Sequence, residues 1–314
     1  ELDEKHEYNM EAAQALAKAG LFKTWIPKEY GGHSAGVLAL SLIAEELAKA
    51  DSGFGVAFAV NALGSFPIVL GGTEEQKQKY LPLIGNGEKF VAFCLSEKFA
   101  GSDASGLAVT AVKDGDDYII NGEKKWTTNG GVADIYSVFC VTDPNSKSRR
   151  ISAFAVEKGT PGFSVKKIED KMGIRCVPVV ETHFDNVRVP KENLLLGEGR
   201  GFEISQVRLG PGRIHHCMRS IGQAEKALDL MIDRGLNRVA FGKKIVDLGK
   251  NMETISRAKI EIESMRLLVL KAAKAMDVLG NKEARIWVSM IKAKVPEQVC
   301  DIIDQAMQVH GATG

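Results

Sequence analysis

The sequence has few cysteines, almost no net charge and no long uninterrupted apolar run, and each shortage excludes a class of protein. Its five cysteines include no CxxC pair, which argues against a disulfide framework or a zinc knuckle and is typical of a reducing compartment. A formal net charge of +1 gives no basis for binding nucleic acid or a membrane surface. We find no apolar run long enough to span a bilayer, and we expect no membrane insertion.

Several familiar motifs are also missing. The glycines between Gly197 and Gly201 lack the preceding strand and the spacing of a dinucleotide-binding loop. The segment 241–244 lacks the first glycine and the Ser or Thr of a P-loop. His215 and His216 would point in different directions on a helix and have no acidic or Cys partner at i+4, so we predict a structural role and no metal site.

A length of 314 residues favours two or three packed units, and the periodicity of the sequence changes twice along the chain. Residues 1–90 are typical of a helical domain. Within them, 37–50 is apolar, and we expect Glu45 and Glu46 on its solvent face. Thr73 begins a capping-box pattern with the Gln three residues later, which predicts a helix start.

Residues 91–201 change to short β-type runs. Asp114-Gly115 and Asn121-Gly122 are predicted turn pairs between the runs. No long helix alternates with the runs, so we predict an antiparallel sheet or barrel rather than a Rossmann sheet. The runs are Val91–Leu95, Leu107–Val112, Tyr118–Ile120, Ile135–Val141 and Ile151–Val156, with two more around Phe163–Val165 and Thr182–Val189.

Residues 202–314 are helical again. Apolar side chains recur there at alternating steps of three and four residues, which predicts one long helix that ends at Gly280. Such a stripe needs a partner helix, so a bundle is expected, and we interpret the stripe as core packing rather than a cofactor site. The stripe consists of Ile255, Ala258, Ile262, Met265, Val269, Ala272, Met276 and Leu279.

The most informative stretches are Ala92–Asp103 (AFCLSEKFAGSD) and Glu123–Gly131 (EKKWTTNGG). The first is strand-like and ends in small and polar residues that let a ligand approach the backbone. The second places an aromatic plate, Trp126, beside two threonine hydroxyls. A flat ring system with polar edges needs such a set of planes, hydroxyls and amides. From the residues alone, an ordinary β-hairpin with exposed polar side chains explains these stretches at least as well.

With these stretches, the chain resembles the acyl-CoA dehydrogenase family over essentially its whole length. AFCLSEKFAGSD and KKWTTNGG are similar to the family's two flavin-contact signatures, in the same order and at the same spacing. The fold that the resemblance implies is α+β and multidomain, with an N-terminal helical domain (1–90), a middle antiparallel β-domain (91–201) and an incomplete C-terminal helical bundle (202–314). Further matching segments are Tyr30–Gly32, Thr73–Leu81, Val189–Asn193, Gly199–Phe202, Arg238–Lys243 and Gln308–Gly314.

The resemblance also implies an activity, which is the FAD-dependent α,β-dehydrogenation of an acyl-CoA thioester to the enoyl-CoA in fatty acid metabolism. Electrons would pass to an electron-transferring flavoprotein. The expected assembly is a homotetramer or homodimer, in the bacterial cytoplasm or the mitochondrial matrix. Two alternatives stay open at this point: an acyl-CoA oxidase on the same scaffold, and a non-catalytic binding or scaffold protein.

The implied flavin contacts fall into two groups. Phe93, Leu95 and Ser96 should line the flavin edge, and Trp126 to Thr128 should lie beside the isoalloxazine, with Thr128 near N5. Ser102 should serve the nucleotide or the CoA moiety, and Arg238, Phe241, Gln308, Gly311 and Ala312 should contact FAD of a neighbouring subunit. The full implied FAD set is Phe93, Leu95, Ser96, Ser102, Trp126, Thr127, Thr128, Arg238, Phe241, Gln308, Gly311 and Ala312.

Substrate contacts and the catalytic base follow the family pattern only in part. Ser102, Gly210 and Arg213 are the implied substrate contacts, although the family's usual Asp-x-Gly-Arg turn reads Gly-Pro-Gly-Arg here. Most members carry the catalytic carboxylate beyond the turn that includes Gly314, and the position that a minority use is Gly212. We therefore name no catalytic base and expect the natural protein to extend past both ends of this sequence.

Overall fold

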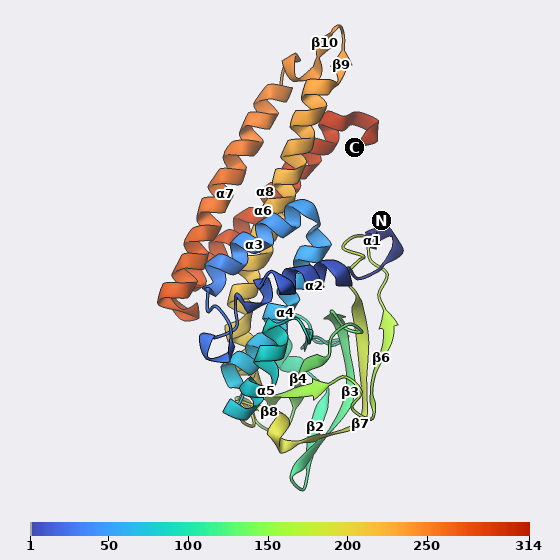
Figure 1. Cartoon of the computed structure of the whole chain (residues 1–314), viewed down its shortest axis with the longest axis vertical. Helices are drawn as coiled ribbons and strands as arrows, with labels where there is room; N and C mark the ends of the chain where they lie inside the picture. The colour runs from blue at the N-terminus through green and yellow to red at the C-terminus, as the bar shows by residue number, and fades with distance from the viewer. Residues whose placement is uncertain (1) are drawn as a thin grey trace. The chain divides into compact units, whose positions relative to one another are not determined.

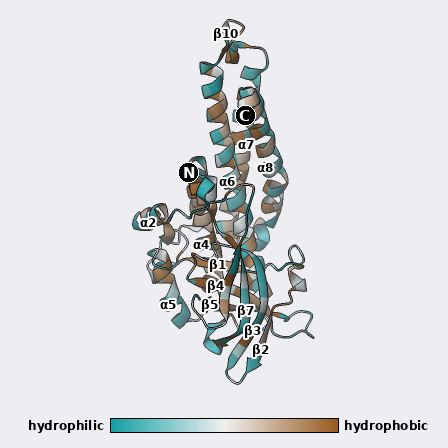
Figure 2. Cartoon of the chain, turned by 90° about the vertical axis from the view of Figure 1, so that its right-hand side faces the viewer, coloured by the Kyte–Doolittle hydropathy of each residue, from teal (hydrophilic) through white to brown (hydrophobic). Residues whose placement is uncertain are grey.

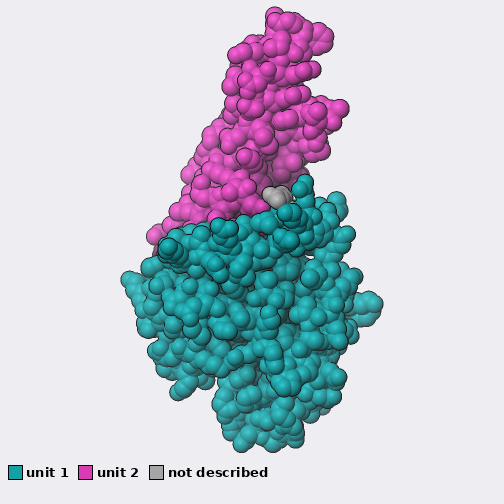
Figure 3. Space-filling model, turned by 45° about the vertical axis from the view of Figure 1, so that its right-hand side comes forward, with its two compact units in different colours: residues 1–35, 56–209 teal, residues 36–55, 210–314 magenta. Residues whose placement is uncertain are grey.

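The computed structural model describes residues 2–314, and they form two compact units. Unit 1 contains Glu1–Ala35 and Val56–Leu209, and unit 2 contains Gly36–Gly55 and Gly210–Gly314 (Figure 3). The boundaries at residues 90 and 201 stay a prediction, since these units are grouped by contacts and not by chain order.

The helical part of unit 1 lies at the start of the chain (Figure 1). Its predicted capping box is confirmed, because Gln76 N donates to Thr73 Oγ1 at 3.2 Å and Thr73 N donates to Gln76 Oε1 at 2.7 Å. Two otherwise unpaired amides are thereby satisfied, which fixes the helix start. The helices are α1 (Leu2–Lys5), α2 (Met10–Lys18), α4 (Ser52–Gly71, from residue 56 in this unit) and α5 (Glu74–Gly85).

Helix α4 corrects the expectation about apolar runs. Its 20 residues have a mean hydropathy of 1.7, enough by length and composition to cross a membrane, but 72% of that stretch is buried inside the protein. This burial is typical of the core helix of a folded domain. Asn61 and Ser65 interrupt the apolar sequence and are buried: Asn61 Oδ1 accepts from Val91 N at 2.9 Å, and Ser65 Oγ accepts from Trp25 Nε1 at 2.8 Å. These partners balance the loss of water around both polar groups.

An eight-stranded sheet forms most of the rest of unit 1, in the order β6-β7-β3-β2-β4-β5-β8, with β1 paired to β4. Most neighbours are antiparallel, as predicted. The prediction is wrong for β1 and β2, which both pair with β4 in parallel. A long connection separates β1 from β4, and such a connection is what parallel pairing requires. The strands are β1 (Val91–Cys94), β2 (Thr110–Asp114), β3 (Asp117–Thr128), β4 (Ile135–Val141), β5 (Ile151–Glu157), β6 (Phe163–Ile168), β7 (Val179–Pro190) and β8 (Leu194–Leu195).

The two predicted turns have different outcomes. Asp114-Gly115 forms the β2–β3 hairpin, in which Asp114 pairs with Asp117. Asn121-Gly122 does not form a turn, because it lies inside β3 at a register shift against β7. Gly122 has φ of 129°, and a Cβ there would lie 2.9 Å from a side-chain methyl of Val109. The glycine therefore serves a close approach within the sheet and not a chain reversal.

The centre of the sheet is the core of unit 1. All seven residues of β4 are buried, whereas β6 at the edge is mostly exposed. Figure 2 shows the same contrast in hydropathy between the apolar strands β1, β4 and β5 and the more polar β2, β3 and β7. An alternation of buried and exposed residues persists on β3 and β7, which have one face in the core.

Unit 2 is a helical assembly with one hydrophobic core. Ile214 and Met218 of α6, Ile262 and Met265 of α7, and Ile291 of α8 are all buried in this core, as the predicted bundle requires. Its elements are α3 (Gly36–Ala50), α6 (Gly201–Asn237, from residue 210 in this unit), β9 (Val239–Ala240), β10 (Lys243–Lys244), α7 (Asn251–Leu279) and α8 (Asn281–His310).

The structure of unit 2 confirms two of three expectations from the sequence. The predicted stripe on α7 is buried for most of its length, and the helix ends before Gly280 as expected, although Leu279 is 59% exposed. The expected turn at Gly210–Arg213 is wrong, because α6 runs through it without a break. A Cβ on Gly210 would lie 2.0 Å from Asn281 Oδ1, so the glycine allows a close approach to the start of α8.

Glu45 is not on a solvent face and is only 4% exposed. Its Oε1 accepts from Arg266 Nε at 2.7 Å, and Arg266 also pairs with Glu225 at 2.6 Å and with Glu263 at 2.7 Å. A carboxylate can be buried when an arginine neutralises it. The helix pattern of residues 37–50 did not predict this because Arg266 lies more than two hundred residues away in the sequence.

Candidate functional site

The end of strand β1 and the segment that follows it carry the first group of implied residues. Phe93 is partly buried on β1, and its ring packs against Phe139 with centroids 4.9 Å apart. Leu95 and Ser96 follow the strand and are also partly exposed. The carbonyl of Ser96 accepts from Lys125 N at 2.9 Å, so the two signature stretches lie against each other.

A buried ion pair fixes this arrangement. Lys124 is fully buried, and its Nζ donates to Glu97 Oε1 at 2.7 Å and to the Leu95 carbonyl at 3.0 Å. Glu97 also accepts from the backbone amides of Ala108 at 2.7 Å and Val109 at 3.0 Å. Both charges therefore have several partners, which is the condition for burying an ion pair. Through the Leu95 carbonyl, Lys124 ties β3 to the segment after β1.

Trp126 is placed by a bulge in β3. The pairing of β3 with β7 shifts register between Lys124 and Thr127, and Trp126 lies between them with φ of 59°. A positive φ is costly for a bulky residue and persists only where the surrounding structure imposes it. The Trp126 side chain is 49% exposed, so the bulge presents an aromatic plate outside the core.

The two threonines after Trp126 have different surroundings. Thr127 is 1% exposed, and its hydroxyl donates to Cys94 Sγ at 3.5 Å. Burial raises the pKa of the Cys94 thiol to about 11, so it stays protonated and acts as a core residue. Thr128 is only partly buried. Of the two hydroxyls, that of Thr128 is the one available to a ligand on the exposed side of Trp126.

Ser102 lies apart from this group, in an exposed loop after β1. The next residue, Asp103, accepts from Ser105 N at 3.2 Å and caps the short 3₁₀ turn Ala104–Gly106. The structure therefore gives Ser102 a solvent-facing position.

The implied contacts in unit 2 lie near the ends of α6 and α8. Arg238 and Phe241 belong to the β9–β10 hairpin region that follows α6, and Phe241 is 92% exposed with φ of 53°. Gln308 is exposed in the last turn of α8. Arg234 Nη2 donates to the His310 carbonyl at 3.3 Å and so joins the two helix ends. Gly311 and Ala312 follow in an exposed 3₁₀ turn, Gly311–Thr313.

The implied substrate residues on α6 do not point to one site. Gly210 is buried against α8, and Arg213 is exposed.

His215 is fully buried, and its ring contacts that of His216 edge-on, with ring centroids 5.2 Å apart. Within residues 2–314, no group of three or more His, Cys, Asp or Glu side chains is arranged to hold a metal ion.

Comparisons with known proteins show which family the chain belongs to. The chain matches three family models: the acyl-CoA dehydrogenase N-terminal domain over residues 1–88, the middle domain over 92–187 and the C-terminal domain over 199–314. The chain belongs to the acyl-CoA dehydrogenase family. This is a family of FAD-dependent oxidoreductases that act on a CH–CH bond of acyl-CoA substrates.

Individual relatives are similar over most of the chain. A cyclohex-1-ene-1-carbonyl-CoA dehydrogenase of Geobacter metallireducens is 38% identical over the whole chain, which spans 83% of that protein. Acyl-CoA dehydrogenase family member 11 of Rattus norvegicus is 40% identical over 99% of the chain, which spans 41% of that protein.

Solved structures of the family share the fold. Butyryl-CoA dehydrogenase from Megasphaera elsdenii has a TM-score of 0.94 and 36% identity, over 99% of this chain and 82% of the other. An acyl-CoA dehydrogenase from Bacillus anthracis, solved in complex with FAD, has a TM-score of 0.91 and 31% identity, over 96% of this chain and 55% of the other.

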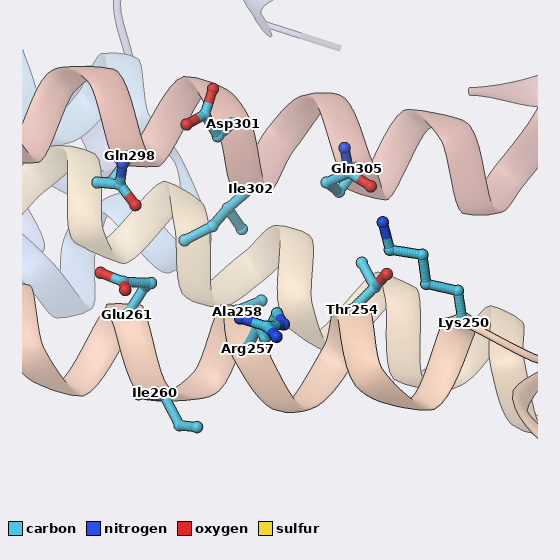
Figure 4. Close-up of a pocket in the computed structure, with 10 residues that line it drawn as sticks. All are labelled: Lys250, Thr254, Arg257, Ala258, Ile260, Glu261, Gln298, Asp301, Ile302 and Gln305. Carbon is cyan, nitrogen blue, oxygen red and sulfur yellow. The ribbon is translucent and has the colours of Figure 1, made fainter.

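A cavity of about 370 Å³ lies between α7 and α8 of this acyl-CoA dehydrogenase family member (Figure 4). Its walls carry both signs of charge, and none of the residues implied for FAD or substrate lines it. The lining residues are Lys250, Thr254, Arg257, Ala258, Ile260, Glu261, Gln298, Asp301, Ile302 and Gln305.

Sequence reasoning missed three charged residues beside the first group. Glu97 and Lys124 were hidden within the two signatures, where only the tertiary structure shows that they pair. Arg208 of α6 places its guanidinium carbon 4.0 Å from the centre of the Phe93 ring. The only signal for Arg208 was its place just before the Gly-Pro-Gly-Arg stretch, and it is a weak one.

Proposed function

We propose that this chain binds FAD along the exposed side of Trp126 and catalyses α,β-dehydrogenation of an acyl-CoA thioester. The observation that carries the proposal is the β3 bulge, which presents a strained and exposed Trp126 beside the segment after β1. A flat ring with polar edges fits this place, because Trp126 offers an aromatic plane and Thr128 and Ser96 offer hydroxyls at its border.

The residues of this chain would hold the cofactor and the substrate in fixed positions. Phe93, Leu95 and Ser96 would line one edge of the isoalloxazine, and Thr128 would hydrogen bond near its N5. When bound, FAD supplies the acceptor for the hydride that leaves the substrate β-carbon. The backbone amides and hydroxyls around the site would orient the thioester, whose polarised carbonyl makes the α-proton removable. A carboxylate would take the α-proton, and we assign that base to no residue within 2–314.

A second copy of the chain completes the proposed site. Arg238 and Phe241 are exposed near the end of α6, and an apolar side chain that is 92% exposed favours contact with another molecule. We propose that Arg238, Phe241, Gln308, Gly311 and Ala312 contact FAD held by a neighbouring subunit, in a homodimer or homotetramer. Arg238 would pair with the pyrophosphate.

The electron acceptor and compartment are also part of the proposal. Electrons from the reduced flavin would pass to an electron-transferring flavoprotein. All five cysteines of the described chain are free, and four of them are buried, which agrees with a reducing compartment such as the bacterial cytoplasm or the mitochondrial matrix.

The test is the anaerobic absorbance spectrum of the FAD-loaded protein during addition of acyl-CoA thioesters. We expect one acyl class to bleach the flavin band in a single turnover. Thr128→Val should slow this bleaching by about tenfold or more, because one hydrogen bond near N5 is lost. Thr110→Val, on the exposed face of β2, is the matched control and should leave the rate unchanged. A flavin band that no acyl-CoA bleaches would contradict the proposed function.

A further inference from the structure

Arg208 is a cation on an apolar wall. It projects from α6 over the Phe93 ring, with 4.0 Å between the guanidinium carbon and the ring centre, and its Nε donates weakly to the Leu63 carbonyl of α4 at 3.4 Å. Leu63 is 2% exposed, and the Phe93 ring also packs against the ring of Phe139. The guanidinium therefore lies where α4 meets the end of β1, beside a residue proposed to line the flavin edge.

The charge of Arg208 has no balancing carboxylate. Among residues 2–314, no ion pair to Arg208 is found, and burial alone lowers the pKa of its guanidinium to about 10. It stays protonated at neutral pH, since that pKa is still well above 7. An arginine placed in apolar surroundings without a counter-ion is costly, and the aromatic ring offsets only part of that cost. Within the described part of the chain, four of its five N–H donors have no acceptor at hydrogen-bond distance.

We propose that Arg208 is a specificity-determining residue that binds an anionic oxygen group, a carboxylate or a phosphate ester, carried on the acyl chain of the CoA substrate. This inference rests on the proposed function and names its substrate class. A planar guanidinium with free paired donors matches either group in a two-point contact. A plain saturated acyl chain needs only the apolar wall, and the cation would add nothing to its binding.

The experiment compares acyl-CoA ligands of one chain length by calorimetry on the FAD-loaded protein. The probes are hexanoyl-CoA, its ω-carboxy analogue and its ω-phosphate ester analogue. We expect the wild type to bind at least one anionic probe about tenfold or more tightly than hexanoyl-CoA, because a charge-assisted hydrogen bond is gained. Arg208→Gln should abolish that preference and leave the affinity for hexanoyl-CoA within about threefold of the wild type. The two anionic probes distinguish carboxylate from phosphate.

Arg200→Gln is the matched control, because Arg200 is an exposed arginine that pairs with Glu203 at 2.9 Å within the same part of the chain. It should keep the wild-type preference. The FAD dissociation constant of each variant is measured in parallel. If Arg208→Gln weakens FAD and leaves the ligand preference intact, Arg208 holds the cofactor and the inference is overturned.

Two further outcomes separate the inference from the proposed function. If the wild type binds all three probes equally and hexanoyl-CoA bleaches the flavin, the inference fails and the proposed function stands. If no acyl-CoA binds or bleaches the flavin, both fail. The wild-type preference is itself a test, so the inference stays falsifiable even if Arg208→Gln does not fold.

Discussion

Two cations lie near the end of strand β1, the fully buried Lys124 and the partly buried Arg208, and they differ in what balances their charge. Lys124 is neutralised by Glu97, which is held in turn by two backbone amides. The guanidinium of Arg208 contacts the Phe93 ring and, weakly, the Leu63 carbonyl. The difference indicates that the Lys124 charge serves the folded chain itself, whereas the Arg208 charge is available to a ligand.

The largest expected effect comes from Lys124→Met. The substitution leaves Glu97 buried and without its cation, and removing one partner of a buried pair costs about 3–5 kcal/mol. We expect a loss of that size in the free energy of unfolding, measured by urea denaturation. The double variant Lys124→Met with Glu97→Gln should recover much of it. If Lys124→Met is as stable as the wild type, the Lys124 charge does not stabilise the fold, and the two cations do not differ in this respect.

A second test uses the charge network of unit 2. Burial acts to raise the pKa of Glu225, but hydrogen bonds from Lys49 and Arg266 outweigh it and lower the pKa to about 2. A lowered carboxyl pKa contributes stability that is complete above the unfolded value near 4.5 and is lost as pH falls toward 2.

Urea midpoints between pH 5 and pH 3 should therefore fall more steeply for the wild type than for Glu225→Gln. An unchanged slope would show that Glu225 does not titrate with folding. The control is Glu253→Gln on α7, an exposed helical pair with Arg257, for which the effect on the slope should be much smaller.

The smallest expected effect on stability comes from Arg208→Met. A cation without a counter-ion is costly to bury, so its replacement by an apolar side chain of similar length should change the free energy of unfolding by no more than about 1 kcal/mol. Thermal or urea unfolding of the FAD-free protein measures this directly. A loss as large as that of Lys124→Met would mean that Arg208 has a structural role like that of Lys124.

Much of the secondary structure follows from local sequence. The capping box at Thr73, the hairpin at Asp114-Gly115 and the end of α7 before Gly280 each depend on residues within one or two turns of each other. The β-type runs also correspond to strands, since their period of two is a property of the chain segment itself. The order of the zones and the two signature stretches were enough to identify the family.

Part of the candidate site was also visible in the sequence. Trp126 and Thr128 were expected beside a flat ring, and the structure leaves Trp126 exposed and Thr128 partly exposed. Thr127 was expected with them, but its side chain faces the core, so any contact it makes with FAD would use its backbone. A bulge decides which of three consecutive residues faces outward, and sequence spacing does not show where the register shifts.

The sequence by itself determined the helices, most of the strands, the family and the two stretches that we propose line the flavin edge, because these depend on neighbours along the chain. Only the tertiary structure decided that Glu45 is buried, that Asn121-Gly122 lies inside a strand and that α6 continues through Gly210. It alone placed Arg208 over Phe93 without a counter-ion. Each of these depends on partners distant in sequence, and burial and charge balance are set by what packs against a residue in space.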